Sequence, residues 1–133
     1  MIENLCSSSL DMKWHTISVN DKIEDVAKFE AEALKSMNLN VSEIPPRYRS
    51  TYFAHIFSGG YSAGYYSYLW TEMLSHDAYD WFKDNGLLTR ENGQKFRDQV
   101  LSKGNTMDYA EMYKTFAGRN PEAAPMLKAR GLK

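Results

Sequence analysis

Apolar residues recur along most of the chain at the spacing of an amphipathic helix. The clearest case is a predicted helix whose apolar stripe lies opposite a charged face and consists of Ile23, Val26, Phe29, Ala33 and Met37. Asn20 or Asp21 can cap its start, because a short polar side chain can accept a hydrogen bond from a free backbone N–H of the first turn. Before it, the pattern from about Leu5 to Ile17 predicts a helix that is buried on more than one face and has no capping residue at its start.

Prolines and glycines divide the middle of the chain. Pro45 and Pro46 must interrupt regular structure, since proline is excluded from the helix interior and pushes the residue before it into extended geometry. The pattern then predicts a short helix or apolar turn over 52–57 and a long helix from about Tyr61 to Asn85 that stops at Gly86. The expected core face of the long helix is Tyr66, Leu69, Met73 and Phe82.

Three shorter helices are expected in the remaining sequence. Thr89 can start a helix that stops at Gly104, and Thr106 or Asp108 can start one that stops at Gly118. Asn120 and Pro121 form a suitable pair of first residues for a last helix that ends near Gly131, with Pro125 tightening or kinking its first turn. No segment alternates as a strand would. The sequence therefore predicts an all-α fold, a compact bundle of about six helices in a single domain over residues 1–133.

Composition narrows the possible partners and compartments. The chain has 133 residues and a net charge of -1, which gives no general attraction to nucleic acid or to anionic membranes. No segment is long and apolar enough to span a membrane, and the N-terminus lacks the features of a signal peptide. Cys6 is the single cysteine, so no internal disulfide can form, and we expect a cytoplasmic location.

One run, from His55 to Tyr68, concentrates tyrosines, glycines and one of the 3 histidines. Gly59 and Gly60 favour a hinge or tight turn where a ligand can approach the backbone. If the following residues are helical, Tyr61 and Tyr68 share a face, and their neutral hydroxyl groups could hold carbonyls or an oxyanion. Packing in the core is the alternative for these two tyrosines, and it is the favoured role for the neighbouring Tyr66.

Other candidate residues carry weaker signals. His15 is expected to be a hydrogen-bonded structural histidine. Glu72 and His76 could share a metal ion, although such a pair is more often a surface contact. His55 and Ser58 are near each other in sequence, without the Gly-x-Ser-x-Gly context of a nucleophile elbow. The sequence contains no His-Glu-x-x-His, no Cys-x-x-Cys and no Walker phosphate loop.

Eight short segments, spread along the chain, together resemble the sequence of a known protein family. They are Asp11-Met12-Lys13-Trp14-His15, Pro45-Pro46-Arg47-Tyr48-Arg49-Ser50, Tyr52-Phe53-Ala54-His55-Ile56-Phe57, Gly59-Gly60-Tyr61, Gly64-Tyr65-Tyr66, Tyr68-Leu69-Trp70, Leu88-Thr89-Arg90-Glu91-Asn92-Gly93 and Arg130-Gly131-Leu132. Together they resemble the C-terminal end of bacterial peptidyl-dipeptidases (dipeptidyl carboxypeptidases), which belong to the thimet oligopeptidase and neurolysin family of zinc metallopeptidases. The resemblance implies a part of a helical clamshell whose deep channel admits short peptides.

The resemblance also implies what this sequence does not carry. Family members hold zinc with a His-Glu-x-x-His helix and a later glutamate, and that motif does not occur in this sequence. We therefore expect a C-terminal fragment of a much longer metallopeptidase, with no metal ligand of its own and no activity alone. With the remaining catalytic portion of the enzyme, it would hydrolyse short peptides and release C-terminal dipeptides.

By resemblance, the run from His55 to Tyr68 forms a wall of the substrate cleft. His55 and Tyr61 would contact the peptide backbone, and Tyr68 would donate a hydrogen bond to the oxyanion. The loop of Gly59 and Gly60 would move when substrate binds.

The sequence leaves open the roles of two arginines and an alternative function for the chain. Arg47 or Arg49 could read the free carboxylate of the substrate, or both could be solvated loop charges. The alternative function is a stand-alone helical module that binds peptides or associates with itself.

Overall fold

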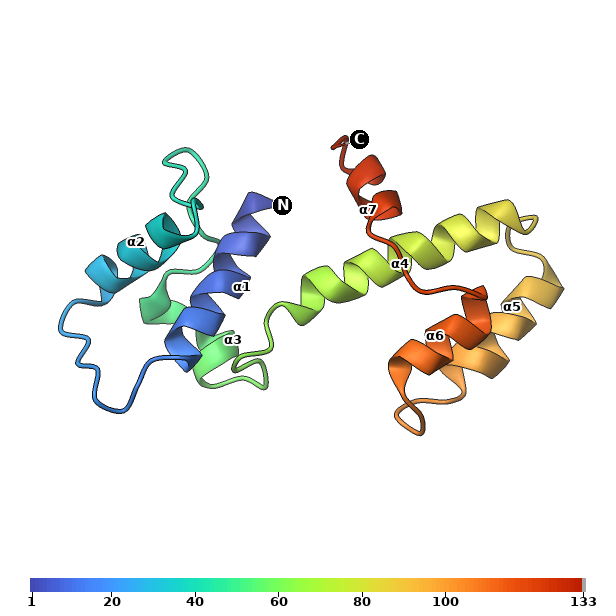
Figure 1. The fold of residues 1–133 in the computed structure, drawn as a ribbon, viewed down its shortest axis with the longest axis horizontal. Coiled ribbons are helices and arrows are strands. Elements are labelled where there is room, and N and C mark those ends of the chain that lie inside the picture. Colours follow the sequence, from blue (N-terminus) through green and yellow to red (C-terminus); the bar gives the residue numbers. More distant parts are fainter. Residues whose placement is uncertain (133) are drawn as a thin grey trace. The chain divides into compact units, whose positions relative to one another are not determined.

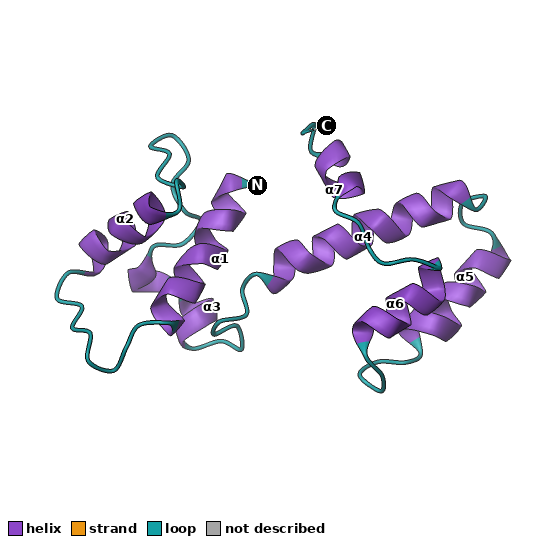
Figure 2. Cartoon of the chain, in the orientation of Figure 1, coloured by secondary structure: helices purple, strands orange, loops and turns teal. Residues whose placement is uncertain are grey.

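Helices, joined by turns and loops, are the regular structure of residues 1–132, the part of the chain that the computed structural model describes (Figures 1 and 2). No strand occurs among these residues, so the predicted all-α class is confirmed. Backbone contacts divide the chain into two compact units, unit 1 over Met1–Leu69 and unit 2 from Trp70 onward. The expectation of a single domain stays a prediction.

Unit 1 contains three α-helices and one short 3₁₀ turn before the start of a fourth helix. They are α1 (Ile2–His15), α2 (Val26–Ser36), the 3₁₀ turn Ser50–Tyr52 and α3 (Ala54–Phe57). Met1 makes no side-chain capping bond to α1, as expected for its uncapped start. The prolines at 45 and 46 lie in the long connection between α2 and the 3₁₀ turn, so the predicted break in structure is confirmed.

The cap of α2 differs from the prediction. Asp25 is the capping residue, and its Oδ1 accepts a hydrogen bond from the backbone N–H of Lys28 at 2.9 Å. Asp21 instead accepts a hydrogen bond from the N–H of Ser18 at 2.8 Å and closes a turn before the helix. The helix therefore starts several residues later than the apolar stripe suggests, and Ile23 lies outside it.

The core of unit 1 consists of two clusters. One joins α1 to α2 through Cys6, Leu10, Ala33 and Leu34, and the other is built on Phe53, Ile56 and Tyr65. The buried carboxylate of Glu30 lies beside them and accepts hydrogen bonds from Ser50 N at 2.8 Å and Ser50 Oγ at 2.9 Å.

Arg49 completes the environment of Glu30, with Nη1 2.6 Å from Oε1. Burial opposes the charge of this carboxylate, but the hydrogen bonds from Arg49 and Ser50 outweigh burial and hold the pKa of Glu30 below its ordinary value. Since Trp14 Nε1 also donates to Ser50 Oγ at 2.8 Å, this polar group ties α1 and α2 to the 3₁₀ turn.

The remaining helices are α4 (Ser67–Asp84), α5 (Arg90–Phe96), a π-helical turn (Arg97–Leu101), α6 (Tyr109–Ala117) and α7 (Ala124–Ala129). The predicted caps Thr89 and Asp108 are confirmed, because their side chains accept hydrogen bonds from backbone N–H groups of α5 and α6. Gly118 ends α6 with φ of 76°, a left-handed conformation that glycine adopts without steric cost.

The start of α7 differs from the prediction. The helix begins at Ala124, and Ala123 rather than Asn120 precedes it. Pro125 lies in the first turn, where its missing N–H has no helical partner to lose. The first turn therefore accommodates Pro125 without a kink in the helix.

Aromatic residues dominate the core of unit 2. Trp81, Phe82 and Phe116 form its buried cluster, with Phe96 and Val100 packed against it. Asp77 is fully buried nearby, and its oxygens bind the Arg119 guanidinium at 2.8 and 2.9 Å and the Tyr113 hydroxyl. Of the predicted core face of α4, Met73 and Phe82 are buried.

Phe116→Ala should lower the free energy of unfolding of unit 2 by about 3–5 kcal/mol, because it opens a cavity in a well-packed aromatic cluster. Phe116 is 0% exposed, whereas Leu88 is 80% exposed and serves as the control. Leu88→Ala should change the stability by less than about 0.5 kcal/mol. Denaturant unfolding followed by near-UV circular dichroism checks both values, and equal effects would contradict the assigned core.

Candidate functional site

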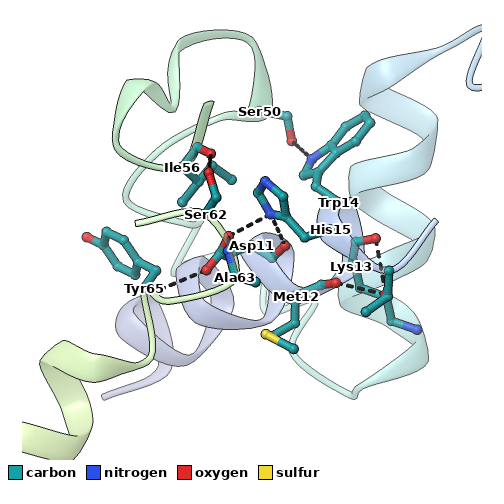
Figure 3. A network of polar contacts seen from close by, with 11 residues as sticks. Asp11, Met12, Lys13, Trp14, His15, Ser50, Ile56, Ser62, Ala63 and Tyr65 are labelled. Atoms are coloured by element: carbon teal, nitrogen blue, oxygen red, sulfur yellow. Dashed lines mark hydrogen bonds and ion pairs between the residues drawn. The ribbon is translucent and has the colours of Figure 1, made fainter. Parts of the chain in front are cut away.

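The residues between Ser58 and Tyr66 form turns, so α4 does not begin at Tyr61 as predicted. Ala63 has φ of 53°, a left-handed conformation that a helix cannot contain. The cause lies in α1, where both oxygens of Asp11 accept backbone hydrogen bonds, Oδ1 from Ala63 N and Oδ2 from Tyr65 N, each at 2.8 Å (Figure 3). A carboxylate distant in sequence therefore sets the path of this segment.

His15 belongs to the same network. Its Nδ1 lies 2.8 Å from the carbonyl oxygen of Asp11 and 2.8 Å from Oδ1 of that residue (Figure 3). Since both neighbours are oxygen acceptors, Nδ1 carries the proton and donates. The prediction of a hydrogen-bonded structural histidine is confirmed.

The glycine loop follows α3 closely. A Cβ on Gly59 would lie 2.8 Å from the carbonyl oxygen of His55, too close for any side chain at that position. A Cβ on Gly60 would meet nothing within 4 Å. The loop is held on its far side by Ser62, whose Oγ donates to the carbonyl of Ile56 at 2.6 Å. The predicted movement of the loop stays a prediction.

The turns bring the predicted site residues together. The rings of Tyr61 and Tyr68 are stacked with centroids 5.0 Å apart, and the His55 ring lies 6.0 Å from that of Tyr61. Tyr65 fills the space beneath them, 5.9 Å from His55 and 5.0 Å from Tyr68, and it is buried. The stacking matches the expectation that Tyr61 and Tyr68 share a face, although no continuous helix joins them.

Tyr68 has an altered acidity. A hydrogen bond with Tyr61 is the main cause that raises the pKa of Tyr68 to about 12, with desolvation as the second. The side chain is nevertheless 41% exposed. Tyr68 is thus a neutral hydroxyl group at physiological pH, and it is hydrogen-bonded with Tyr61 in this structure.

A cavity of about 260 Å³ opens beside this group. It is lined by His55 and Tyr68 together with Glu3, Asn4, Arg47, Tyr48 and Tyr65. Glu3 and Asn4 come from the first turn of α1, and sequence reasoning missed them because nothing local marks those positions as neighbours of the tyrosine run. Tyr48 was inside the segment Pro45 to Ser50 that carries the resemblance, and its ring lies 5.0 Å from that of His55.

Several other expectations can be compared with the structure. Tyr66 is 53% exposed, so the prediction that it lies in the core is wrong. Tyr65, which follows the left-handed turn at Ala63, is buried instead. The hydroxyl of Ser58 donates to the carbonyl of Ala54 at 3.1 Å, which gives no support to a dyad with His55.

The carboxylate of Glu72 is paired with the guanidinium of Arg130. Both of its oxygens accept from Arg130, with Nε 3.0 Å from Oε1, while His76 Nε2 is 3.8 Å away. Within residues 1–132, no group of three or more metal-binding side chains is close enough to hold a metal ion.

None of the helices in this part of the chain is long and apolar enough to cross a membrane.

Comparison with known proteins shows a match over nearly the whole sequence. The model of peptidase family M3 matches residues 1–132. The dipeptidyl carboxypeptidase of Escherichia coli (strain K12) is 52% identical over 132 residues, which are 99% of this chain and 19% of that protein. The dipeptidyl carboxypeptidase of Salmonella typhimurium shows the same identity and coverage.

A third relative matches a shorter stretch. Oligopeptidase A of Salmonella typhimurium is 48% identical over 81 residues, which are 61% of this chain and 12% of that protein. The chain therefore spans about a fifth of the length of the two dipeptidyl carboxypeptidases, at 19% of each.

Asp11→Asn should lower the stability of unit 1 by about 2–3 kcal/mol, because an amide offers one acceptor oxygen where the carboxylate offers two. Denaturant unfolding measures the loss. Asp21→Asn is the matched control, since Asp21 accepts one exposed backbone N–H and should cost less than about 1 kcal/mol. Equal losses in the two variants would contradict the anchoring role of Asp11.

Tyr61→Phe should lower the pKa of Tyr68 from about 12 toward the ordinary value of 10.0, because it removes the hydrogen bond that is the main cause of the shift. NMR titration of labelled tyrosine rings at alkaline pH measures the change. Tyr66→Phe, a neighbouring tyrosine outside the stack, should leave the pKa of Tyr68 unchanged. A pKa of Tyr68 that is insensitive to Tyr61→Phe would refute this hydrogen bond.

Proposed function

This chain belongs to peptidase family M3, and we propose on that premise that it forms the substrate-binding wall of a zinc-dependent peptidyl-dipeptidase. The whole enzyme would hydrolyse short peptides and release C-terminal dipeptides. This chain would supply hydrogen-bond donors to the peptide and to the reacting carbonyl, and the metal would be held elsewhere in the enzyme.

The observation that carries the proposal is the grouping of His55, Tyr61 and Tyr68. Two of the three, His55 and Tyr68, line one cavity, and Tyr61 stacks on Tyr68 from the side. A peptide backbone presents alternating donors and acceptors, and an imidazole or a phenol can serve as either. The group is thus suited to bind a peptide without reading its side chains.

Each residue has a distinct proposed role. Tyr68 donates its hydroxyl proton in a hydrogen bond to the oxyanion that develops when the peptide carbonyl is attacked, which makes it the catalytic residue of this chain. The hydroxyl group is protonated at physiological pH, as it would be at the ordinary tyrosine pKa of 10.0. His55 and Tyr61 bind the peptide backbone next to that carbonyl. Tyr65, packed beneath them, positions the rings.

Gly59 and Gly60 would form the moving part of the wall. Neither has a side chain to obstruct a peptide, and both are exposed. We propose that substrate contacts their backbone groups when the loop closes.

The family's zinc does not fit the residues of this segment. Family members are zinc metallopeptidases, but the one candidate pair, Glu72 and His76, has its carboxylate taken by Arg130. The described residues also contain no group of metal-binding side chains. We therefore propose that the remaining catalytic portion of the enzyme is the chain's partner and that the chain alone is inactive.

Compartment and partners follow from the same proposal. We place the enzyme in the cytoplasm, which suits a chain whose single cysteine, Cys6, is buried and free. Short peptides would be its substrates, with no role for nucleic acid or membrane. A stand-alone module that binds peptides or associates with itself stays an alternative prediction.

A chimera tests the proposal. This chain would replace the matching segment of the Escherichia coli dipeptidyl carboxypeptidase, to which it is 52% identical. The chimera should release dipeptides from short peptides, and Tyr68→Phe should lower kcat by about 10²–10³-fold with a much smaller change in substrate affinity.

Tyr66→Phe is the matched control two residues before Tyr68, because Tyr66 is exposed and does not line the cavity. Its kcat should equal that of the parent chimera. A folded, zinc-loaded chimera that cleaves no peptide would refute the proposed function. Equal kcat values for Tyr68→Phe and the parent would remove Tyr68 from the oxyanion role.

A further inference from the structure

We propose that Asp11 is a positioning residue, which keeps residues 61–66 out of helix α4 and thereby brings the tyrosines of the site together. It acts through the backbone of Ala63 and Tyr65, whose N–H groups its two oxygens bind at 2.8 Å each (Figure 3). Its effect on catalysis rests on the proposed function, whereas its effect on the conformation of the segment does not.

The local sequence of this segment favours a helix. Tyr61, Tyr65 and Tyr68 recur at the spacing of one helix face. Gly64 N donates to the carbonyl of Tyr61 at 2.9 Å, and Tyr68 N donates to that of Tyr65 at 3.3 Å. Both bonds span three residues, as in a tight 3₁₀-type turn, so the backbone is already close to helical.

Ala63 interrupts this run at a cost. Its φ of 53° lies in the left-handed region, which is unfavourable for a residue with a Cβ. Alanine also has the highest helix propensity, so both the backbone strain and the side chain favour a right-handed helix at this position. A contact from elsewhere in the fold must therefore hold the turn.

Asp11 supplies that contact. Two bonds to the neighbouring α3 hold the first part of the segment, from Tyr61 N to the carbonyl of His55 at 3.2 Å and from Ser62 Oγ to that of Ile56 at 2.6 Å. Asp11 binds the N–H groups at and after the left-handed residue. It is 0% exposed, and a carboxylate makes stronger hydrogen bonds than a neutral acceptor.

The turn allows the two tyrosines to meet. In a continuous helix, residues 61 and 68 would lie about 10.5 Å apart along the axis, and their side chains would lean in the same direction. In the structure the rings of Tyr61 and Tyr68 are stacked with centroids 5.0 Å apart, and the two residues are hydrogen-bonded. A helical segment would break both contacts.

Asparagine cannot replace Asp11 in this role. Its side chain has one acceptor oxygen and an NH₂ group that donates, so one of the two backbone N–H groups would face another donor. His15 adds to the conflict, because its Nδ1 donates to Asp11 Oδ1 at 2.8 Å.

Asp11→Asn in this chain should let α4 extend toward Tyr61. Backbone ¹³C chemical shifts measured by NMR should move to right-handed helical values over residues 61–66, and the pKa of Tyr68 should fall from about 12 toward 10.0. A substitution that only destabilised the fold would lose helical signal instead of gaining it. Asp21→Asn, the matched control, should leave both readings unchanged.

Ala63→Gly should reverse the effect of Asp11→Asn. Glycine adopts a positive φ without steric cost and is a poor helix former, so this second substitution favours the turn over the helix by about tenfold or more. Ala63 is exposed, so the lost methyl group removes little packing. The double variant should regain the carbon shifts and the Tyr68 pKa of the parent chain.

Ala63→Val challenges the same turn with Asp11 in place. A β-branched residue is strongly disfavoured at a φ of 53°, so residues 61–66 should again shift toward the helix. If Asp11→Asn does not fold, a folded Ala63→Val chain with the carbon shifts of the parent overturns the inference.

The chimera with the Escherichia coli enzyme measures the catalytic consequence. Asp11→Asn should lower kcat by about 100-fold, because a catalytic group displaced by about an ångström loses that much rate. Adding Ala63→Gly should recover about tenfold or more of the loss, and Asp21→Asn should match the parent chimera.

The inference is overturned if folded Asp11→Asn keeps residues 61–66 in the turn with an unchanged kcat. It is also overturned if kcat falls without helical shifts and Ala63→Gly restores nothing. If the parent chimera cleaves no peptide, the proposed function fails. The carbon shifts and the Tyr68 titration, which need no peptide, then decide the role of Asp11.

Discussion

The carboxylate of Asp11 is the interaction on which the candidate site depends. It is completely buried, and removing a carboxylate from water is costly unless hydrogen bonds replace the lost solvation. Here the backbone N–H groups of Ala63 and Tyr65 and the ring of His15 provide that replacement. Two of these donors lie in the turns before α4. The hydrogen bonds that stabilise the buried charge therefore also fix the backbone of the candidate site.

Three of the buried or partly buried carboxylates of the fold are each paired with an arginine. Glu30 binds Arg49 and Asp77 binds Arg119, while the partly buried Glu72 binds Arg130. Each pair joins segments that are distant in sequence, so these arginines are part of the framework. Arg47 differs, because it lies in a cavity beside aromatic rings and makes no such pair in the described residues.

The site consists of neutral donors beside one cation, without a metal ligand of its own. Such an arrangement agrees with the proposed role of holding and orienting a peptide, in which the rest of the enzyme would activate the water. The rings of Tyr61 and Tyr68 are stacked, and the hydrogen bond between the two residues raises the pKa of Tyr68 to about 12. The membership of family M3 and the coverage of 19% of its dipeptidyl carboxypeptidase relatives agree with a partial site.

The sequence by itself determined the helical class and several helix boundaries, because caps such as Thr89 and Asp108 and the stop at Gly118 act within one turn of the backbone. The tyrosine and glycine run drew attention to Tyr61 and Tyr68, and the roles that the resemblance gives to His55, Tyr61 and Tyr68 stay a prediction. Tertiary structure alone decided that α4 starts at Ser67, that Tyr65 rather than Tyr66 is buried, and that Arg49 rather than Arg47 is held by Glu30. The physical reason is sequence separation: Asp11 acts on residues 52 and 54 positions away, and Glu30 on a residue 19 positions away, which no local pattern of apolar and polar residues can encode.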